Sequence, residues 1–175
     1  MKWIATLTLA VCLGSPLFAA PPVLHKAGEF TITEASGEST LLSSHRGKVV
    51  IVQFLYTTCV HCQETARMLT KLHSEFGGRG LDVIGVAFNP EAQGRPEVVT
   101  SFTKANSVGF PVGTAAPDSV LSYLGVSLAE RFLVPQIVVI DRKGMLRAKS
   151  QAAGSPELQD EAYLRTLVDG LLKSK

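Results

Sequence analysis

The chain has few cysteines. Three occur in its 175 residues, and one of them, Cys12, lies in an apolar N-terminal segment. If that segment is removed, two cysteines remain, which is too few for the multi-bridge frameworks that hold small exported domains together. A zinc centre needs four ligands, and neither a second Cys pair nor a His-x(3–5)-His spacing accompanies these two. The sequence therefore disfavours both a disulfide scaffold and a metal site.

The chain also lacks a strong charge of either sign. It carries 17 Lys and Arg side chains against 15 Asp and Glu side chains, and loss of Lys2 with the N-terminal segment brings the two sets closer still. Proteins that bind nucleic acids or anionic lipids usually have an excess of basic side chains. The balance over the whole chain argues against both kinds of partner.

Residues 1–20 have the pattern of a secretory signal peptide. Lys2 supplies the positive start, an apolar stretch runs from Ile4 to Leu13, and Leu17-Phe-Ala19 offers a cleavage site. This stretch is far shorter than the ~20 apolar residues that cross a bilayer, and no later segment is long enough. We expect a mature domain of residues 21–175 that is periplasmic or otherwise exported, with no stable membrane insertion. An uncleaved N-terminal anchor is the alternative.

The two remaining cysteines, Cys59 and Cys62, stand two residues apart between two predicted elements. The apolar run 49–56 before them indicates a strand that is buried on both faces. A dithiol at a helix N-terminus can open and close, because the positive end of the helix stabilises the thiolate of the first cysteine. A permanent staple is the alternative, although closing so short a loop stabilises a fold little. The helix after the pair is predicted by an apolar stripe of Cys62, Ala66, Leu69, Leu72 and Phe76.

The rest of the chain predicts alternating strands and helices. Residues 29–33 and 39–42 indicate an N-terminal hairpin, and residues 81–88 a second buried strand. A strand, a helix and a second strand in this order predict a parallel pair joined by a right-handed crossover. We further expect helices over 97–106, 117–124 and 156–172 (the last burying Leu158, Ala162, Val168 and Leu171), a short edge strand over 110–113, and an antiparallel pair over 136–141 and 145–149.

The order of these elements and their motifs resemble the thioredoxin fold. The motif residues are Phe54-Leu-Tyr-Thr-Thr-Cys-Val-His-Cys62 and Val134-Pro135, followed by Gln136-Ile-Val-Val-Ile140. With the N-terminal hairpin, an insertion at about 89–117 and the signal peptide, the chain resembles the exported TlpA/ResA-like thiol–disulfide oxidoreductases from about Gly28 onward. The resemblance implies an α/β fold with a mixed central sheet flanked by helices, an N-terminal β-hairpin extension and no cofactor.

The resemblance also implies roles for individual residues. Cys59 would attack partner disulfides, and Cys62 would resolve the mixed disulfide. Pro135 resembles the cis-proline of the family, which would leave the backbone of Val134 free to pair with an extended partner segment. The alternative is an ordinary trans proline at the start of an edge strand. Gln53 stands where thioredoxin has a buried Asp, and the TlpA-like branch commonly has a neutral amide there.

His61 lies between the two cysteines, where the oxidant DsbA also carries a histidine. A histidine there can favour the thiolate, which raises the reduction potential toward the oxidising end. A solvent-exposed side chain with little effect is an equal alternative. The TlpA-like framework instead implies a reductant of exported proteins, acting on protein thiols and disulfides and supplied by an upstream redox partner.

Two other functions occur on the thioredoxin fold. Peroxiredoxins use a Pro-x(3)-Thr-x(2)-Cys motif, whereas Tyr56 stands three residues before Cys59 and no proline stands just upstream. Copper-delivery modules space their cysteines by three and add a distal histidine, so the spacing of two counts against them. The sequence therefore favours thiol–disulfide exchange over thiol peroxidase activity and copper delivery.

Overall fold

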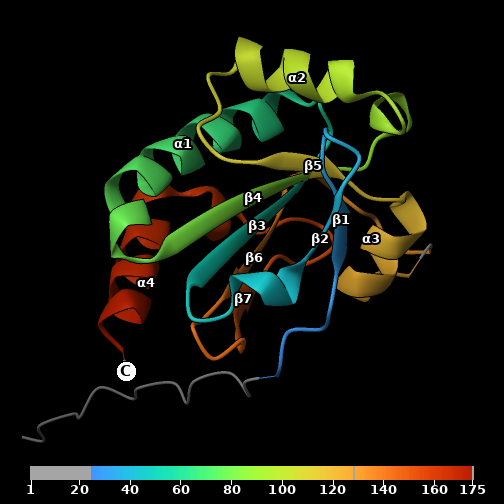
Figure 1. The fold of residues 1–175 in the computed structure, drawn as a ribbon. Helices are drawn as coiled ribbons and strands as arrows, with labels where there is room; N and C mark the ends of the chain where they lie inside the picture. The colour runs from blue at the N-terminus through green and yellow to red at the C-terminus, as the bar shows by residue number, and fades with distance from the viewer. Residues whose placement is uncertain (1–24, 128, 175) are drawn as a thin grey trace, which may run out of the picture.

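The computed structural model describes residues 25–127 and 129–174, which form one seven-stranded sheet with helices on both faces (Figure 1). The strands lie in the order β2-β1-β5-β4-β3-β6-β7. Their bounds are β1 Thr31–Thr33, β2 Ser39–Leu41, β3 Val49–Leu55, β4 Leu81–Ala87, β5 Val112–Thr114, β6 Gln136–Ile140 and β7 Leu146–Lys149. The α-helices are α1 Val60–Phe76, α2 Pro96–Ala105, α3 Pro117–Leu124 and α4 Glu161–Lys173.

The central strands alternate their side chains between two cores. Val49, Ile51 and Leu55 of β3 belong to the core under α1, α2 and α4, whereas Val52 and Phe54 belong to the core shared with α3 and the N-terminal hairpin. Every residue of β3 is buried, as expected for a strand covered on both faces. Cys59 lies between this strand and α1, and Cys62 lies in the first turn of α1, so the site adjoins a strand that is buried on both faces.

The predicted strand-helix-strand unit and the N-terminal hairpin are confirmed. β3 and β4 pair in parallel across α1, and β1 pairs with β2 in antiparallel fashion. The stripe predicted for the first helix is buried along its whole length. The mixed α/β sheet with its hairpin extension is the fold class that the sequence predicted.

Three predictions about the periphery are wrong. β5 is not an edge strand, because β1 pairs with it through Thr33 and Thr114. Gly113 permits this approach, since a Cβ there would lie 2.6 Å from the backbone oxygen of Thr33. The last helix is divided into a 3-10 turn, Pro156–Gln159, and α4, because the Asp160 side chain accepts a hydrogen bond from the backbone N–H of Tyr163 and starts a new helix. Ala162 consequently lies exposed in the first turn of α4.

The N-terminal prediction falls outside the described residues. The expected signal peptide, residues 1–20, precedes residue 25, the first described. In the part of the chain that the structure describes, no helix has both the length and the apolar character needed to cross a bilayer.

Asp82 at the start of β4 makes the stability of the fold sensitive to acid. Burial raises its pKa, but hydrogen bonds from His45 at 2.8 Å and Lys48 at 2.9 Å outweigh this, and the pKa is lowered overall. A carboxyl with a lowered folded-state pKa stabilises the fold above its unfolded-state value of ~3.9, and this contribution is lost as the pH falls through the folded-state pKa. We expect Asp82→Asn to lower Tm at pH 6 by about 2–3 °C, but not at pH 2.

Thermal unfolding followed by circular dichroism between pH 6 and pH 2 measures this effect. Glu97→Gln is the control, because Glu97 is exposed on α2 and forms no ion pair among the described residues. A Tm difference between Asp82→Asn and wild type that stays constant over the whole range would contradict the assignment.

Candidate active site

Cys59 and Cys62 occupy the first turn of α1, with different exposure. Cys59 is the N-cap of the helix, and its Sγ accepts a hydrogen bond from the backbone N–H of Cys62 at 3.3 Å. Cys59 is half-buried, whereas Cys62 is fully buried, and both are thiols in the structure. The N–H that points at Sγ can also donate to a thiolate, which is the nucleophilic form of cysteine. The geometry therefore gives one accessible sulfur and one covered sulfur, as the roles expected of them require.

The two thiols should differ strongly in reactivity. Burial raises the pKa of the Cys62 thiol well above its ordinary value, and the hydrogen bond with Cys59 adds to this. Cys62 is thus held in the less nucleophilic thiol form, and its sulfur has no exposed surface. We expect iodoacetamide to alkylate the native reduced protein at one cysteine, Cys59, with Cys62 reacting at least about tenfold more slowly.

Mass spectrometry of peptides after timed alkylation at pH 8 measures both rates. Alkylation after unfolding in guanidinium is the control, and there the two cysteines should react alike. Equal rates in the native protein would mean that Cys62 is not covered in solution.

The loop before β6 lies directly against Cys59. The Val134–Pro135 peptide bond is cis, as the resemblance implies, and Pro135 is buried. The Cys59 thiol lies 3.8 Å from the backbone oxygen of Val134. Leu133 on this loop and Val60 on the first turn of α1 are among the few large apolar side chains that are exposed in the described chain. The Cys59 sulfur thus lies against the backbone of Val134, and an exposed apolar residue follows Cys59 and another precedes Val134 in the chain.

Gln53 supports the cysteine pair from inside the sheet. It lies on β3, has no exposed surface, and its Nε2 donates to the backbone oxygen of Cys62 at 2.9 Å. Its Oε1 is buried and finds no hydrogen-bond partner in the described part of the chain. Gln53 is therefore placed to hold the first turn of α1, and it brings a neutral amide to the buried side of Cys62.

Gln136, on the opposite face of the sheet, holds the loop that faces Cys59. Its Nε2 donates to the backbone oxygens of Leu133 at 2.6 Å and Gln151 at 3.0 Å, and lies 3.3 Å from that of Ala152. Leu133 also donates its backbone N–H to Ala152 at 2.9 Å. Sequence reasoning treated Gln136 as a strand residue and missed this role. The signal was a lone amide at the head of an otherwise apolar run, directly after Pro135.

Asn89 fixes the segment that leads into the cysteines. Its Oδ1 accepts from the backbone N–H of Thr57 at 3.1 Å, and its Nδ2 donates to the Thr57 hydroxyl at 3.0 Å and to the Glu91 carboxylate at 2.9 Å. Gln63 closes the other side, with Nε2 donating to the backbone oxygen of Thr57 at 3.2 Å. Sequence reasoning missed the contact between Asn89 and Thr57 as well. This contact follows from the parallel pairing of β3 and β4, which end at the same edge of the sheet.

His61 points away from the buried core of the site. It is exposed on the first turn of α1, and its Nδ1 lies 3.4 Å from the Glu64 carboxylate. No hydrogen bond links its ring to Cys59 in the described chain.

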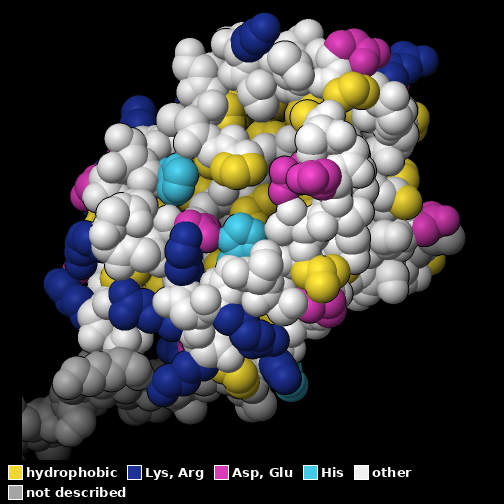
Figure 2. Space-filling view, in the orientation of Figure 1, with side chains coloured by type: hydrophobic (Ala, Val, Ile, Leu, Met, Phe, Trp, Pro, Cys, Tyr) yellow, Lys and Arg dark blue, Asp and Glu magenta, His cyan; other side chains and the backbone are white. Residues whose placement is uncertain are grey.

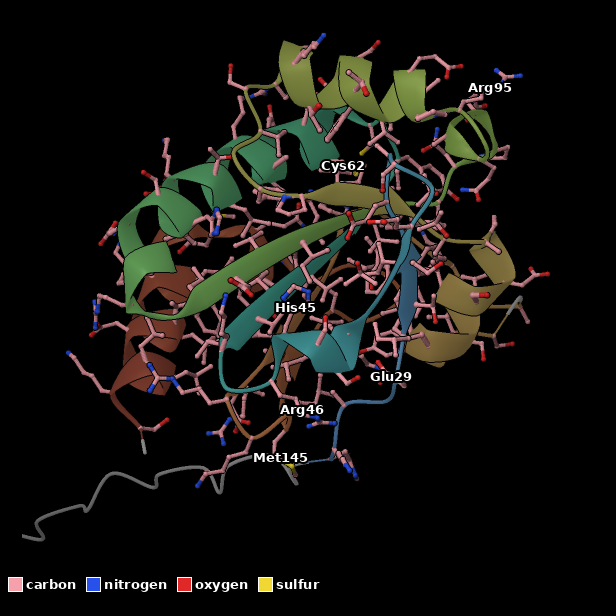
Figure 3. The ribbon with its side chains drawn as sticks, in the orientation of Figure 1. Glu29, His45, Arg46, Cys62, Arg95 and Met145 are labelled. Carbon is pink, nitrogen blue, oxygen red and sulfur yellow. The ribbon has the colours of Figure 1, made fainter. Side chains whose placement is uncertain are left out.

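In residues 25–127 and 129–174, no three His, Cys, Asp or Glu side chains gather in a way that could hold a metal ion. In Figure 3, Cys62 lies at one end of the sheet, below α2 and far from Arg46 and Met145.

The chain is similar to known proteins along most of its length. A model of the AhpC/TSA family matches residues 23–149. Thiol-disulfide oxidoreductase ResA of Geobacillus thermodenitrificans is 24% identical over 155 residues, which cover 84% of this chain and 83% of that protein. Probable glutathione peroxidase 8-B of Xenopus laevis is 32% identical over 94 residues, which cover 50% of this chain and 45% of that protein.

Solved structures carry the same architecture. The solution structure of a putative protein disulfide isomerase from Bacteroides thetaiotaomicron has a TM-score of 0.68 and 26% identity, and the match covers 85% of this chain and 89% of that one. The thioredoxin-like fold predicted from the sequence is therefore confirmed.

Proposed function

The chain belongs to the AhpC/TSA family of thioredoxin-like proteins, and on that premise we propose that it is an exported enzyme that reduces disulfides of partner proteins through Cys59 and Cys62. Its similarity to a ResA protein supports thiol–disulfide oxidoreductase activity. The observation that carries the proposal is the contrast between the two sulfurs, since Cys59 caps α1 beside an exposed loop while Cys62 is fully buried behind it.

The reaction proceeds by two thiol–disulfide exchanges. The Cys59 thiolate attacks one sulfur of the partner disulfide, and the other partner sulfur leaves as a thiolate that takes up a proton. Cys62 then attacks the Cys59 sulfur, the bond from Cys59 to the partner breaks, and the Cys62 proton passes to the departing partner sulfur, which releases the partner as a dithiol and leaves a Cys59–Cys62 disulfide. Two electrons have passed to the partner. An upstream dithiol restores the pair by the same two steps in reverse.

The loop beside Cys59 is the proposed contact for the partner. The backbone of Val134, next to Pro135, would pair with an extended partner segment, as strand addition allows. Val60 and Leu133, which are next to Cys59 and Val134 in the chain, have exposed side chains that could contact an apolar side chain of the partner. Residues 21–175 are the proposed mature domain, and residues 1–20 the proposed export signal.

His61 and Gln53 are proposed as modulators of the redox potential. An imidazolium at position 61 would stabilise the reduced pair, although the Glu64 carboxylate competes for the same ring. The direction of transfer depends on this balance. A reductant is favoured by the resemblance to the ResA branch, whereas an effect of His61 on the thiolate would shift the pair toward the oxidising side.

The test is catalysed reduction of insulin by dithiothreitol, together with equilibration of the purified protein against glutathione. We expect turnover and a potential more reducing than that of the glutathione pool, where each ~30 mV corresponds to a tenfold change in the equilibrium constant. His61→Ala should make the potential more reducing. No catalysed reduction above the background of dithiothreitol would reject the proposed function.

A thiol peroxidase is the second candidate, because half of the chain is similar to a probable glutathione peroxidase. Consumption of hydrogen peroxide by the reduced protein at rates above those of free thiol would favour it. Tyr56 in place of the peroxiredoxin Thr counts against it.

A further inference from the structure

The described residues carry equal numbers of basic and acidic side chains but separate them in space. Lys2 and Lys175 lie outside the described residues, which leaves 15 basic side chains against 15 acidic ones. A balance over the whole chain, which argued against anionic partners, does not reveal such a separation.

A group of basic side chains, here called the basic pole, gathers where β3 and β4 begin and β6 turns into β7. The Arg46 guanidinium lies 3.5 Å from the backbone oxygen of Lys143, and Arg142 donates to the backbone oxygen of Arg79 at 3.1 Å. Figure 2 shows Lys and Arg side chains crowded over this end of the molecule. The basic pole comprises Lys26, Arg46, Lys48, Arg79, Arg142, Lys143, Arg147 and Lys173.

The basic pole has a net positive charge of about four. Its eight basic side chains are accompanied by four acidic ones, namely Glu29, Asp82, Asp141 and Asp169. The adjacent pairs Lys71–Glu161 and Arg165–Glu75 cancel. The remaining five basic and nine acidic side chains leave an excess of four negative charges over the rest of the molecule. The protein is thus strongly polarised.

The basic pole and the cysteines lie at opposite ends of the central strand. β3 begins at Val49, whose N–H bonds to the backbone oxygen of Gly80 beside Arg79, and ends at Leu55 just before the cysteine loop. Seven residues of strand span about 20 Å. Figure 3 shows the same separation, with Arg46 and Met145 at one end and Cys62 and Arg95 at the other.

The N-terminal segment of the chain joins the molecule at the basic pole. Lys26 pairs with Met145 in an isolated bridge, and the backbone oxygen of His25 accepts from Leu146 at 2.8 Å. The 24 residues before this point include the apolar stretch Ile4 to Leu13. If this stretch is retained, which is the alternative to its proposed removal, the chain is attached to a membrane next to the basic pole.

We propose that the basic pole rests on an anionic lipid surface and turns the cysteine pair away from it. The exposed large apolar side chains of the described chain, Leu41, Val60, Leu133 and Tyr163, do not belong to the basic pole, so its contact is electrostatic. Each Lys or Arg at an anionic surface contributes roughly fivefold to affinity. The orientation leaves Cys59 open to soluble partners, and the proposal stands whether or not the proposed redox function does.

The test compares vesicles of phosphatidylglycerol with vesicles of phosphatidylcholine, using protein purified from an exporting cell. Co-sedimentation at 25 mM salt gives the affinity for each kind of vesicle, and the readout is the ratio of these two affinities. An apolar N-terminus that contributes equally to both affinities does not change the ratio. We expect clear preference for phosphatidylglycerol, lost at 300 mM salt because exposed charges are then screened.

Arg46→Gln with Lys143→Gln should lower the preference by about thirtyfold, since both side chains are exposed and form no ion pair among the described residues. Arg95→Gln with Lys104→Gln is the matched control, because it removes the same charge from exposed positions at and beside α2. It should leave the preference within about twofold of wild type. Equal affinity for the two vesicles, or an equal loss in the two double variants, would overturn the proposal.

Discussion

Cys62→Ser is expected to trap partner proteins as stable mixed disulfides, and Cys59→Ser to trap none. Cys59 is the sulfur that a partner can reach, at the N-cap of α1 and 3.8 Å from the Val134 backbone oxygen. Cys62 has no exposed surface, so a partner disulfide cannot contact it. Without the resolving thiol, the first exchange has no second step that releases the partner. Both variants should lose insulin reduction completely.

Substitution of Cys62 by serine removes the thiol but keeps the backbone group that positions Cys59. The bond that positions Cys59 Sγ comes from the backbone N–H of residue 62, which serine retains. The variants are to be expressed in an exporting cell, quenched with acid, alkylated and separated on non-reducing gels. The double variant Cys59→Ser/Cys62→Ser sets the background. Adducts of equal yield from the two single variants would contradict the assignment of Cys59 as the nucleophile.

The sequence predicts the central layers of this fold because burial leaves a pattern there. The run 49–56 is apolar on both faces, and the helix stripe from Cys62 to Phe76 repeats with helical spacing. The position of β5 could not be predicted in this way. Its place depends on β1, more than 75 residues earlier, approaching Gly113 closely, and a short apolar segment does not reveal its neighbours.

Some residues of the candidate site could likewise be predicted from the sequence, and others could not. The Cys-x-x-Cys pair and Pro135 could be recognised because their chemistry or backbone is local to the motif. The contacts of Asn89 and Gln136 could not, since each amide reaches a backbone group on another segment, and an amide in a sequence does not show which carbonyl it will meet. Such side chains are predictable only once the strand pairing is known.

Gln136→Leu should weaken partner capture without changing the reactivity of Cys59. The side chain donates to the Leu133 and Gln151 backbone oxygens, and removal of a buried donor costs ~1–3 kcal/mol. The substitution also removes an Oε1 that has no partner in the described residues, which offsets part of this cost. We expect the free energy of unfolding to fall by about 1–2 kcal/mol, and the loop of residues 133–135 to lose its fixed position beside Cys59.

Ser150→Ala separates a capture defect from a loss of stability. The Ser150 hydroxyl accepts from the backbone N–H of Ile137, the neighbour of Gln136 on β6, at 2.9 Å, and in the described chain no hydrogen bond joins it to residues 133–135. The two substitutions should therefore destabilise alike, by urea unfolding. In a Cys62→Ser background, Gln136→Leu should lower the adduct yield by about tenfold, as a loss of ~1.4 kcal/mol in partner binding implies, while Ser150→Ala leaves it unchanged. The rate at which Cys59 reacts with a small aromatic disulfide should be the same in both, because that reagent needs no loop. If the two variants capture partners equally well, the position of the loop does not contribute to recognition, and Gln136 serves stability alone.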